Sequence, residues 1–194
     1  MTDSTRQSLV SVLSSDHAAI AGLIEHGLRE LGAEDSRPAR EQIVMELVRH
    51  FVAEEQYLHP AIRERVDGGE QLADAAAQSD RECEQLLRDL ENSDSTDAEL
   101  HEVLARLRAR FQTHVRTQER EVFPALAAAF SPPELDELGA DVLGAEQLAP
   151  TRPRAHLFDS AATSKGVSLV EGFVDRVRDA YSRRGVAPDE DGSD

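Results

Sequence analysis

The chain has 194 residues, enough for one domain with a sizeable core and a tail. Its formal net charge of −17 disfavours binding to nucleic acid or to an anionic membrane surface, and favours cations or basic proteins as partners. Hydrophobic residues make up 40% of the chain and aromatic residues only 4%, so the core must be built from small aliphatic side chains, which suits helices.

The N-terminal part of the chain predicts two long amphipathic helices. Apolar residues recur at helical spacing from about residue 8 to residue 31. The second helix begins at a proline-containing start signal, Ser36-Arg37-Pro38, and continues to about residue 66. Pro60 lies inside this second helix and removes the hydrogen bond to the carbonyl four residues earlier, so we expect a kink there.

Two further helices are predicted from about residue 70 to 90 and from about residue 97 to 130. Pro124 should kink the fourth helix as Pro60 kinks the second. Because the four helices are long and their connections short, neighbours must run antiparallel. The predicted fold class is therefore all-α, an up-down-up-down four-helix bundle.

Extra helices are predicted after the bundle. Ser131-Pro132-Pro133-Glu134 is typical of a capped helix start, and a short fifth helix should follow to about Leu148. This gives a domain over residues 1–148 and a linker over residues 149–167. Residues 168–194 are predicted to form an amphipathic helix, which either docks on the bundle or binds a protein partner, followed by an acidic tail.

One stretch of the second helix is repeated in the fourth. Residues 50–62, HFVAEEQYLHPAI, return as HVRTQEREVFPAL at residues 114–126, an offset of 64. The same offset pairs Asp16-His17 with Asp80-Arg81. The chain therefore reads as a duplicated helical hairpin.

The repeated positions carry residues that bind metals. His50 and Glu54 are four residues apart and project from the same side of a helix, while His17 and His114 lie on facing helices. Imidazole and carboxylate groups aimed into a bundle make a mixed nitrogen and oxygen site, which iron or manganese prefers. A single buried histidine is more often a structural residue, but three at corresponding places favour a metal site.

With these motifs, the chain resembles the haemerythrin-like HHE cation-binding domains over roughly residues 8–130, and its tail resembles the actinobacterial branch of that family. The resemblance implies a di-iron site inside a four-helix bundle, with histidines from each helix and carboxylates from helices two and four. By this resemblance His17, His50, Glu54 and His114 lie at ligand positions. It also implies oxygen, peroxide, nitric oxide or iron sensing, with a small oxidant or diatomic ligand as partner.

Two departures from the family pattern concern the second metal. Arg81 stands where the third helix of the family carries histidine, and arginine cannot ligate. We hypothesise that its guanidinium occupies the second metal position and pairs with Glu54 or Glu119, leaving one metal or none. The alternative is a small shift of register that turns Asp80 inward as a substitute ligand.

The second departure is Gln118, a weak ligand that lies one turn after His114. The carboxylate is displaced to Glu119, about 140° from His114 in an ideal helix. Some haemerythrins use a carboxylate five residues after this histidine, and the missing backbone donor at Pro124 could widen the helix, so we predict Glu119 as a ligand. His59 pairs with Phe123 in the repeat and is predicted to be an aromatic packing position.

The sequence favours a cytoplasmic iron protein, with manganese as another metal, and leaves two alternatives. One is a di-iron enzyme that decomposes peroxide. The other is a degenerate bundle without metal that contacts proteins. The N-terminal residues show no basic region followed by a long apolar run, so we expect a soluble intracellular protein. Cys83 is the only cysteine, so no intrachain disulfide or cysteine-based zinc site can form.

Overall fold

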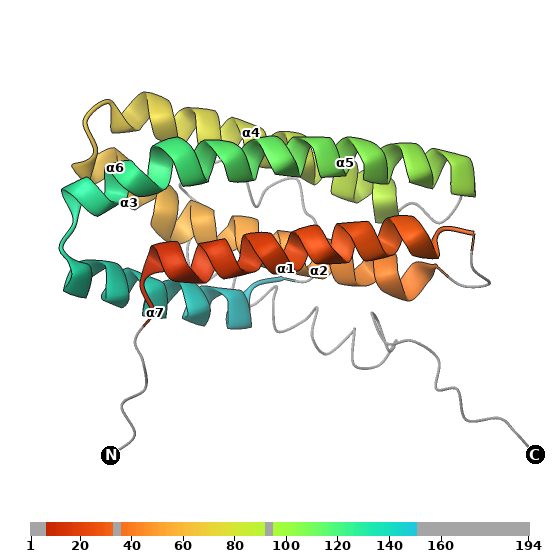
Figure 1. Ribbon diagram of the computed structural model, residues 1–194, viewed down its shortest axis with the longest axis horizontal. Coiled ribbons are helices and arrows are strands. Elements are labelled where there is room, and N and C mark those ends of the chain that lie inside the picture. The colour runs from red at the N-terminus through yellow and green to blue at the C-terminus, as the bar shows by residue number, and fades with distance from the viewer. Residues whose placement is uncertain (1–6, 33–35, 92–94, 151–194) are drawn as a thin grey trace, which may run out of the picture.

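The computed structural model of the protein describes residues 7–32, 36–91 and 95–150, and every regular element in these ranges is a helix (Figure 1). The predicted all-α class is thereby confirmed. None of the described helices is long and apolar enough to cross a membrane. The predicted C-terminal helix from Ser168, and nearly all of the predicted linker, lie outside the described residues.

Four long helical segments form an up-down-up-down bundle, as predicted (Figure 1). The first and third are the single helices α1 (Leu9–Glu30) and α4 (Gly69–Glu91). The second and fourth are each interrupted by a π-helical turn, and their parts are α2 (Arg37–Ala53), η1 (Glu54–Leu58) and α3 (His59–Arg65), then α5 (Asp97–Thr117), η2 (Gln118–Val122) and α6 (Phe123–Ala129). Around the bundle α1 contacts α2 and α5, and α4 contacts the same two helices.

The two prolines act through these π-helical turns. The N–H of His59 donates to the carbonyl of Glu54, five residues earlier, and the N–H of Phe123 donates to that of Gln118. Pro60 and Pro124 follow directly and have no N–H to continue an α-helical ladder, so the chain widens just before each of them. Since the turns are 64 residues apart, both copies of the repeat share the same local distortion.

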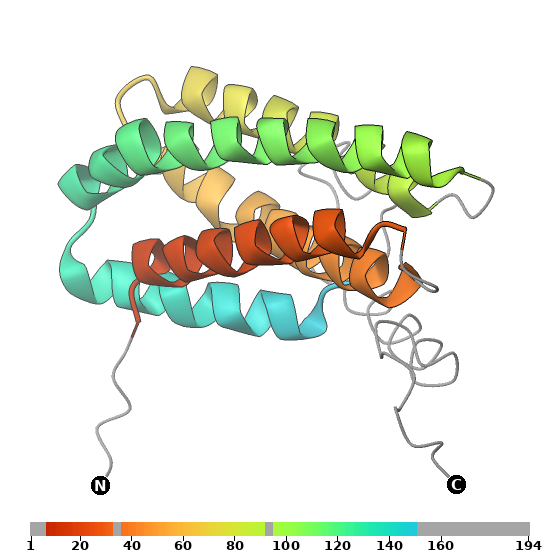
Figure 2. The same cartoon turned by 45° about the vertical axis from the view of Figure 1, so that its right-hand side comes forward.

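A fifth helix, α7 (Pro132–Leu148), packs against α1 and α2 on the outside of the bundle (Figure 2). The N–H of Ser131 donates to the carboxylate of Glu134 at 2.7 Å, which confirms the predicted start. Gly139 allows α7 to approach the beginning of α1, because a Cβ there would lie 2.0 Å from the carbonyl oxygen of Gln7. The predicted short fifth helix is therefore confirmed.

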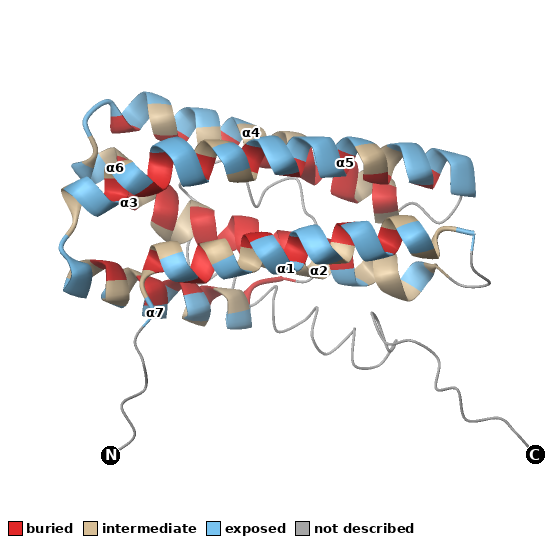
Figure 3. Cartoon of the chain, viewed as in Figure 1, coloured by how far each residue is buried: buried red, intermediate tan, exposed pale blue. Residues whose placement is uncertain are grey.

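The buried residues of the helices face the interior of the bundle (Figure 3). The apolar ones among them form two clusters. One includes Leu47, Phe51 and Leu104, and the other includes Leu58 and Leu126. Buried polar side chains occur in the same interior, each at most 3% exposed: His17, His50, Glu54, His59, Asp80, Glu84, His114 and Gln118. Burying so many polar groups is costly unless they bond to one another or to a ligand.

Candidate metal centre

Four of the predicted ligands meet inside the bundle. One ligand atom from each of His17, His50, Glu54 and His114 lies within 4.8 Å of the other three, and all four side chains are buried. We call this group the four-residue cluster. Nε2 of His50 lies 3.0 Å from Glu54 Oε1, and Nε2 of His114 lies 3.5 Å from the same oxygen. The predicted convergence of residues from α1, α2, η1 and α5 is what the structure shows.

Equivalent residues of the two repeats touch each other at this cluster. Nε2 of His50 and Nε2 of His114 are 3.3 Å apart, and the amide of Gln118 donates to Glu54 Oε1 at 2.7 Å. Both pairs are 64 residues apart in the sequence. The duplicated hairpins therefore meet at the candidate site, and the repeat that indicated the site also determines its geometry.

Each buried histidine presents its Nδ1 atom to a carboxylate. The distances from Nδ1 to the nearest carboxylate oxygen are 3.6 Å for His17 and Glu119, 3.9 Å for His50 and Asp16, 2.9 Å for His59 and Glu55, and 3.3 Å for His114 and Asp80. A carboxylate at Nδ1 favours the tautomer in which Nε2 is free, and this arrangement is usual for histidines that bind metals.

The donor set fits a metal ion. The Nε2 atoms of His50 and His114 converge on one another and on Glu54 Oε1, an arrangement of acceptors that needs positive charge between them. Neither ring nitrogen of His17 has a hydrogen-bond partner among the described residues, and the same holds for Glu54 Oε2. Three imidazoles and one carboxylate suit iron, manganese or zinc.

Without metal, the four-residue cluster collects protons instead. Burial disfavours the charged form of His50 and of His114. The carboxylate of Glu54 outweighs burial only together with that of Asp16 at His50 and that of Asp80 at His114, and the pKa values rise to about 10 and about 9. Burial, together with the charge of His50, lowers the pKa of His17 to about 3. Burial alone would raise the pKa of Glu54, but the two charged histidines hold it well below its usual value.

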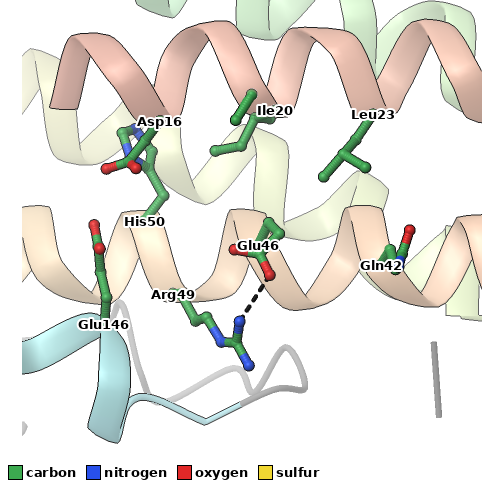
Figure 4. A pocket seen from close by; sticks show the side chains of 9 residues that line it. Asp16, Ile20, Leu23, Gln42, Glu46, Arg49, His50 and Glu146 are labelled. Atoms are coloured by element: carbon green, nitrogen blue, oxygen red, sulfur yellow. Dashed lines mark hydrogen bonds and ion pairs between the residues drawn. The ribbon is translucent and has the colours of Figure 1, made fainter. Parts of the chain in front are cut away.

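A pocket of about 360 Å³ leads from the surface to the other side of His50 (Figure 4). Asp16 on α1 and Glu146 on α7 flank the His50 ring there, and one ligand atom from each of the three lies within 4.8 Å of the others. Burial and the neighbouring Asp16 raise the pKa of Glu146 to about 8. The imidazole of His50 therefore lies between this pocket and the other three residues of the cluster. Glu146 has no counterpart in the repeat, so the sequence contained no signal for it.

Comparison with known proteins gives the family. The pattern of the Hemerythrin HHE cation binding domain matches residues 8–141, about two thirds of the chain. The chain belongs to this family. No curated protein and no solved structure matched the chain. Cation binding is the property that the family description names, and the buried histidines and carboxylate of this HHE domain are ligands of the kind that cation binding needs.

Glu119 and Gln118 occupy different surroundings in this HHE domain. Gln118 is 2% exposed and lies at the four-residue cluster. The Glu119 side chain is 47% exposed and lies 3.6 Å from His17 Nδ1, outside that cluster. Its predicted role as a ligand stays a prediction, and its position suits orientation of the His17 ring.

The hypothesis about Arg81 is wrong in its placement of the guanidinium. Asp80, the residue before Arg81, is buried at 1% exposure and faces His59 and His114. Arg81 is half-buried and donates hydrogen bonds to Gln78 of its own helix. The inward-facing Asp80, which was the alternative, is therefore the arrangement in this HHE domain.

His59 is more than the predicted aromatic packing residue. It is fully buried, with Nδ1 2.9 Å from Glu55 and Nε2 3.3 Å from Asp80. Burial opposes its charge, but hydrogen bonds to Asp80 and Glu55 raise the pKa of His59 to about 10. The repeat concealed this role, because the corresponding residue, Phe123, stacks on His17 with ring centroids 5.7 Å apart.

We expect metal uptake at pH 7 to release about two protons per ion bound at the four-residue cluster, because His50 and His114 must lose their protons to ligate. The apparent affinity should therefore rise with pH up to about pH 10, the higher of the two pKa values. Calorimetry in two buffers of different ionisation enthalpy counts the protons. Uptake without proton release at pH 7 would contradict the assignment of these histidines.

The stability of the metal-free protein should fall as pH rises, whereas its affinity for metal rises. The folded-state pKa values of His50 and His114, about 10 and about 9, lie above the unfolded value of 6.5. The stabilisation from their protons is therefore complete below pH 6.5 and is lost as pH rises towards 10. Thermal unfolding of the metal-free protein between these pH values provides the control for the calorimetry.

Proposed function

We propose that this HHE domain is a non-haem iron protein of the cytoplasm that responds to oxygen, peroxide, nitric oxide or iron. The observation that carries the proposal is the meeting of the His50 and His114 Nε2 atoms with Glu54 Oε1 in the interior of the bundle, with His17 beside them. His17, His50 and His114 would supply nitrogen ligands, and Glu54 a carboxylate. An iron ion held by them would supply redox chemistry towards small oxidants.

The residues around the cluster support this role. Asp16 and Asp80 hold the Nδ1 sides of His50 and His114, so their Nε2 sides are fixed towards the interior. Apolar side chains surround the cluster, with Phe111 and Phe123 stacked on His114 and His17. The cluster itself is only 0–3% exposed, so a diatomic molecule or peroxide fits it better than a bulky substrate does.

The geometry disfavours the alternative of a degenerate bundle without metal. A module that had lost its ion would gain stability by replacing the buried imidazoles and carboxylate with apolar side chains, since buried charges are expensive. Here these four side chains are 0–3% exposed and still converge. Their retention supports the proposal of a working site.

Anaerobic loading with Fe²⁺ tests the proposal on the full chain. Wild type and the exposed-histidine control His101→Ala should retain iron and change their absorption spectrum on addition of oxygen or peroxide, whereas His50→Ala should do neither. No iron uptake by wild type, together with an unchanged melting temperature on metal addition, would favour the non-metal module. Peroxide loss in proportion to bound iron would identify the peroxide-decomposing enzyme, and loss without dependence on iron would exclude it.

A further inference from the structure

The pocket on the outer side of His50 has an acidic end and an apolar wall. Its lining comes from α1, α2 and α7. The carboxylates of Asp16 and Glu146 lie at one end, beside His50, and Ile20 and Leu23 continue the wall along α1 away from that end (Figure 4). At about 360 Å³ the pocket has the size of a small-molecule site.

Three polar atoms at the acidic end lack partners. Asp16 Oδ2, Glu146 Oε1 and His50 Nδ1 are each buried without a hydrogen-bond partner among the described residues. One ligand atom from each of these residues lies within 4.8 Å of the other two. His50 is 1% exposed, and its Nδ1 atom lies 3.9 Å from Asp16 Oδ2, too far for a hydrogen bond. Because unsatisfied polar atoms are costly when buried, their convergence indicates a polar group of a ligand between them.

The balance of donors and acceptors shows what this polar group must be. His50 Nδ1 offers one hydrogen, because Nε2 takes the metal or a second proton, whereas ionised Asp16 and Glu146 offer only acceptors. The charges of the neighbouring Glu46 and Arg49 are already paired, since Arg49 donates to Glu46 at 2.7 Å. An ammonium group has several hydrogens and no lone pair, so it satisfies both free carboxylates at once.

The apolar wall decides between a metal ion and an organic cation. A bare ion at Asp16 and Glu146 would leave the surface of Ile20 and Leu23 in contact with water. An alkyl chain attached to the ammonium group would cover that surface, and each buried CH₂ group tightens binding about threefold. The pocket therefore fits a ligand with a charged head and an aliphatic body.

We propose that this pocket binds a primary alkylamine in its ammonium form, with the ammonium group between Asp16 and Glu146 and the alkyl chain along Ile20 and Leu23. The ligand does not reach the metal centre, because the ring of His50 stands between the pocket and the other three residues of the four-residue cluster. The proposal is therefore independent of the proposed function, although the two sites meet at His50.

Titration of n-butylammonium chloride into the full chain without added metal tests the proposal, with the methyl groups of Ile20 and Leu23 observed by NMR. At about pH 9 the amine is still protonated and Glu146, with its pKa of about 8, is ionised. Both methyl signals should shift and approach saturation with a dissociation constant of about 1 mM or lower. Ammonium chloride, which lacks the alkyl chain, and n-butanol, which lacks the charge, should each bind at least about tenfold more weakly.

A matched pair of variants assigns the binding to the acidic end. Glu146→Gln keeps the shape of the side chain and removes its charge, so it should weaken n-butylammonium at least about tenfold. Glu137→Gln makes the same change at an exposed position of α7 and should leave the affinity unaltered. Equal affinity in Glu146→Gln and wild type would overturn the proposal.

The other outcomes also decide. No saturable shift of Ile20 and Leu23 in wild type would overturn the proposal, because water alone would then fill the pocket. Ammonium chloride or MgCl₂ that binds as tightly as n-butylammonium would overturn it too, because the site would then hold a bare ion. Iron uptake without amine binding would leave only the proposed function standing, and amine binding without iron uptake would leave only this proposal.

Discussion

Replacing Glu54 with glutamine is expected to abolish stable metal binding by this HHE domain. Glu54 is fully buried, its Oε1 atom lies 3.0 Å from His50 Nε2 and 3.5 Å from His114 Nε2, and its Oε2 atom has no hydrogen-bond partner among the described residues. Glutamine keeps the shape of the side chain but loses its charge. Since removing only an outer partner of a ligand costs 10–100-fold, losing this carboxylate should weaken affinity by more than about a hundredfold.

The same substitution should lower the pKa values of two histidines in the metal-free protein. The charge of Glu54 is the main reason that the pKa values of His50 and His114 lie at about 10 and about 9. In Glu54→Gln both pKa values should fall, which NMR titration of the histidines would show. Glu121→Gln, an equal charge change at an exposed position of η2, is the control and should leave affinity and pKa values unaltered. Equal metal affinity in Glu54→Gln and wild type would contradict the site.

Replacing Gln118 with glutamate is expected to have the opposite effect on affinity. The Gln118 amide donates to Glu54 Oε1 at 2.7 Å, and Gln118 is the repeat counterpart of Glu54. A glutamate there would place a second carboxylate at the four-residue cluster in exchange for a neutral donor. Extra negative charge at a buried cation site should tighten divalent metal binding by about tenfold or more.

Competition with a chelator would measure this gain in affinity, and the melting temperature with and without metal would measure its effect on stability. The difference between the two melting temperatures should widen in Gln118→Glu, since a ligand that binds only the folded state stabilises it more as its affinity rises. Gln112→Glu introduces the same charge at an exposed position of α5 and is the matched control. If metal raises the melting temperature of Gln118→Glu by the same amount as that of wild type, Gln118 does not face the metal.

The fold could be predicted because local signals agreed with the tertiary structure. Amphipathic spacing predicted the four long helices, and the Ser131 and Glu134 pair predicted the start of α7. The four-residue cluster was also accessible, because His50 and Glu54 lie one turn apart and the repeat placed His114 opposite. The positions of these residues in the sequence and the period of an α-helix were sufficient to predict the cluster.

The buried group of Glu54, His59 and Asp80 was hidden by local changes in helix geometry that the helical period does not show. In an α-helix His59 would point about 140° away from Glu54, and the π-helical turn removes this angle. On α4 the repeat register indicated Arg81, whereas the helix turns the preceding Asp80 inward. Glu146 reaches His50 only through the docking of α7, a contact between elements that have no repeat relation.

The most direct test of the account is anomalous diffraction from crystals of the full chain grown with Fe²⁺ under anaerobic conditions, measured on both sides of the iron absorption edge. The account predicts an iron peak enclosed by His17, His50, Glu54 and His114. No iron peak among the first four residues, in crystals whose solution contains free Fe²⁺, would contradict the central claim that this bundle is a metal-binding protein.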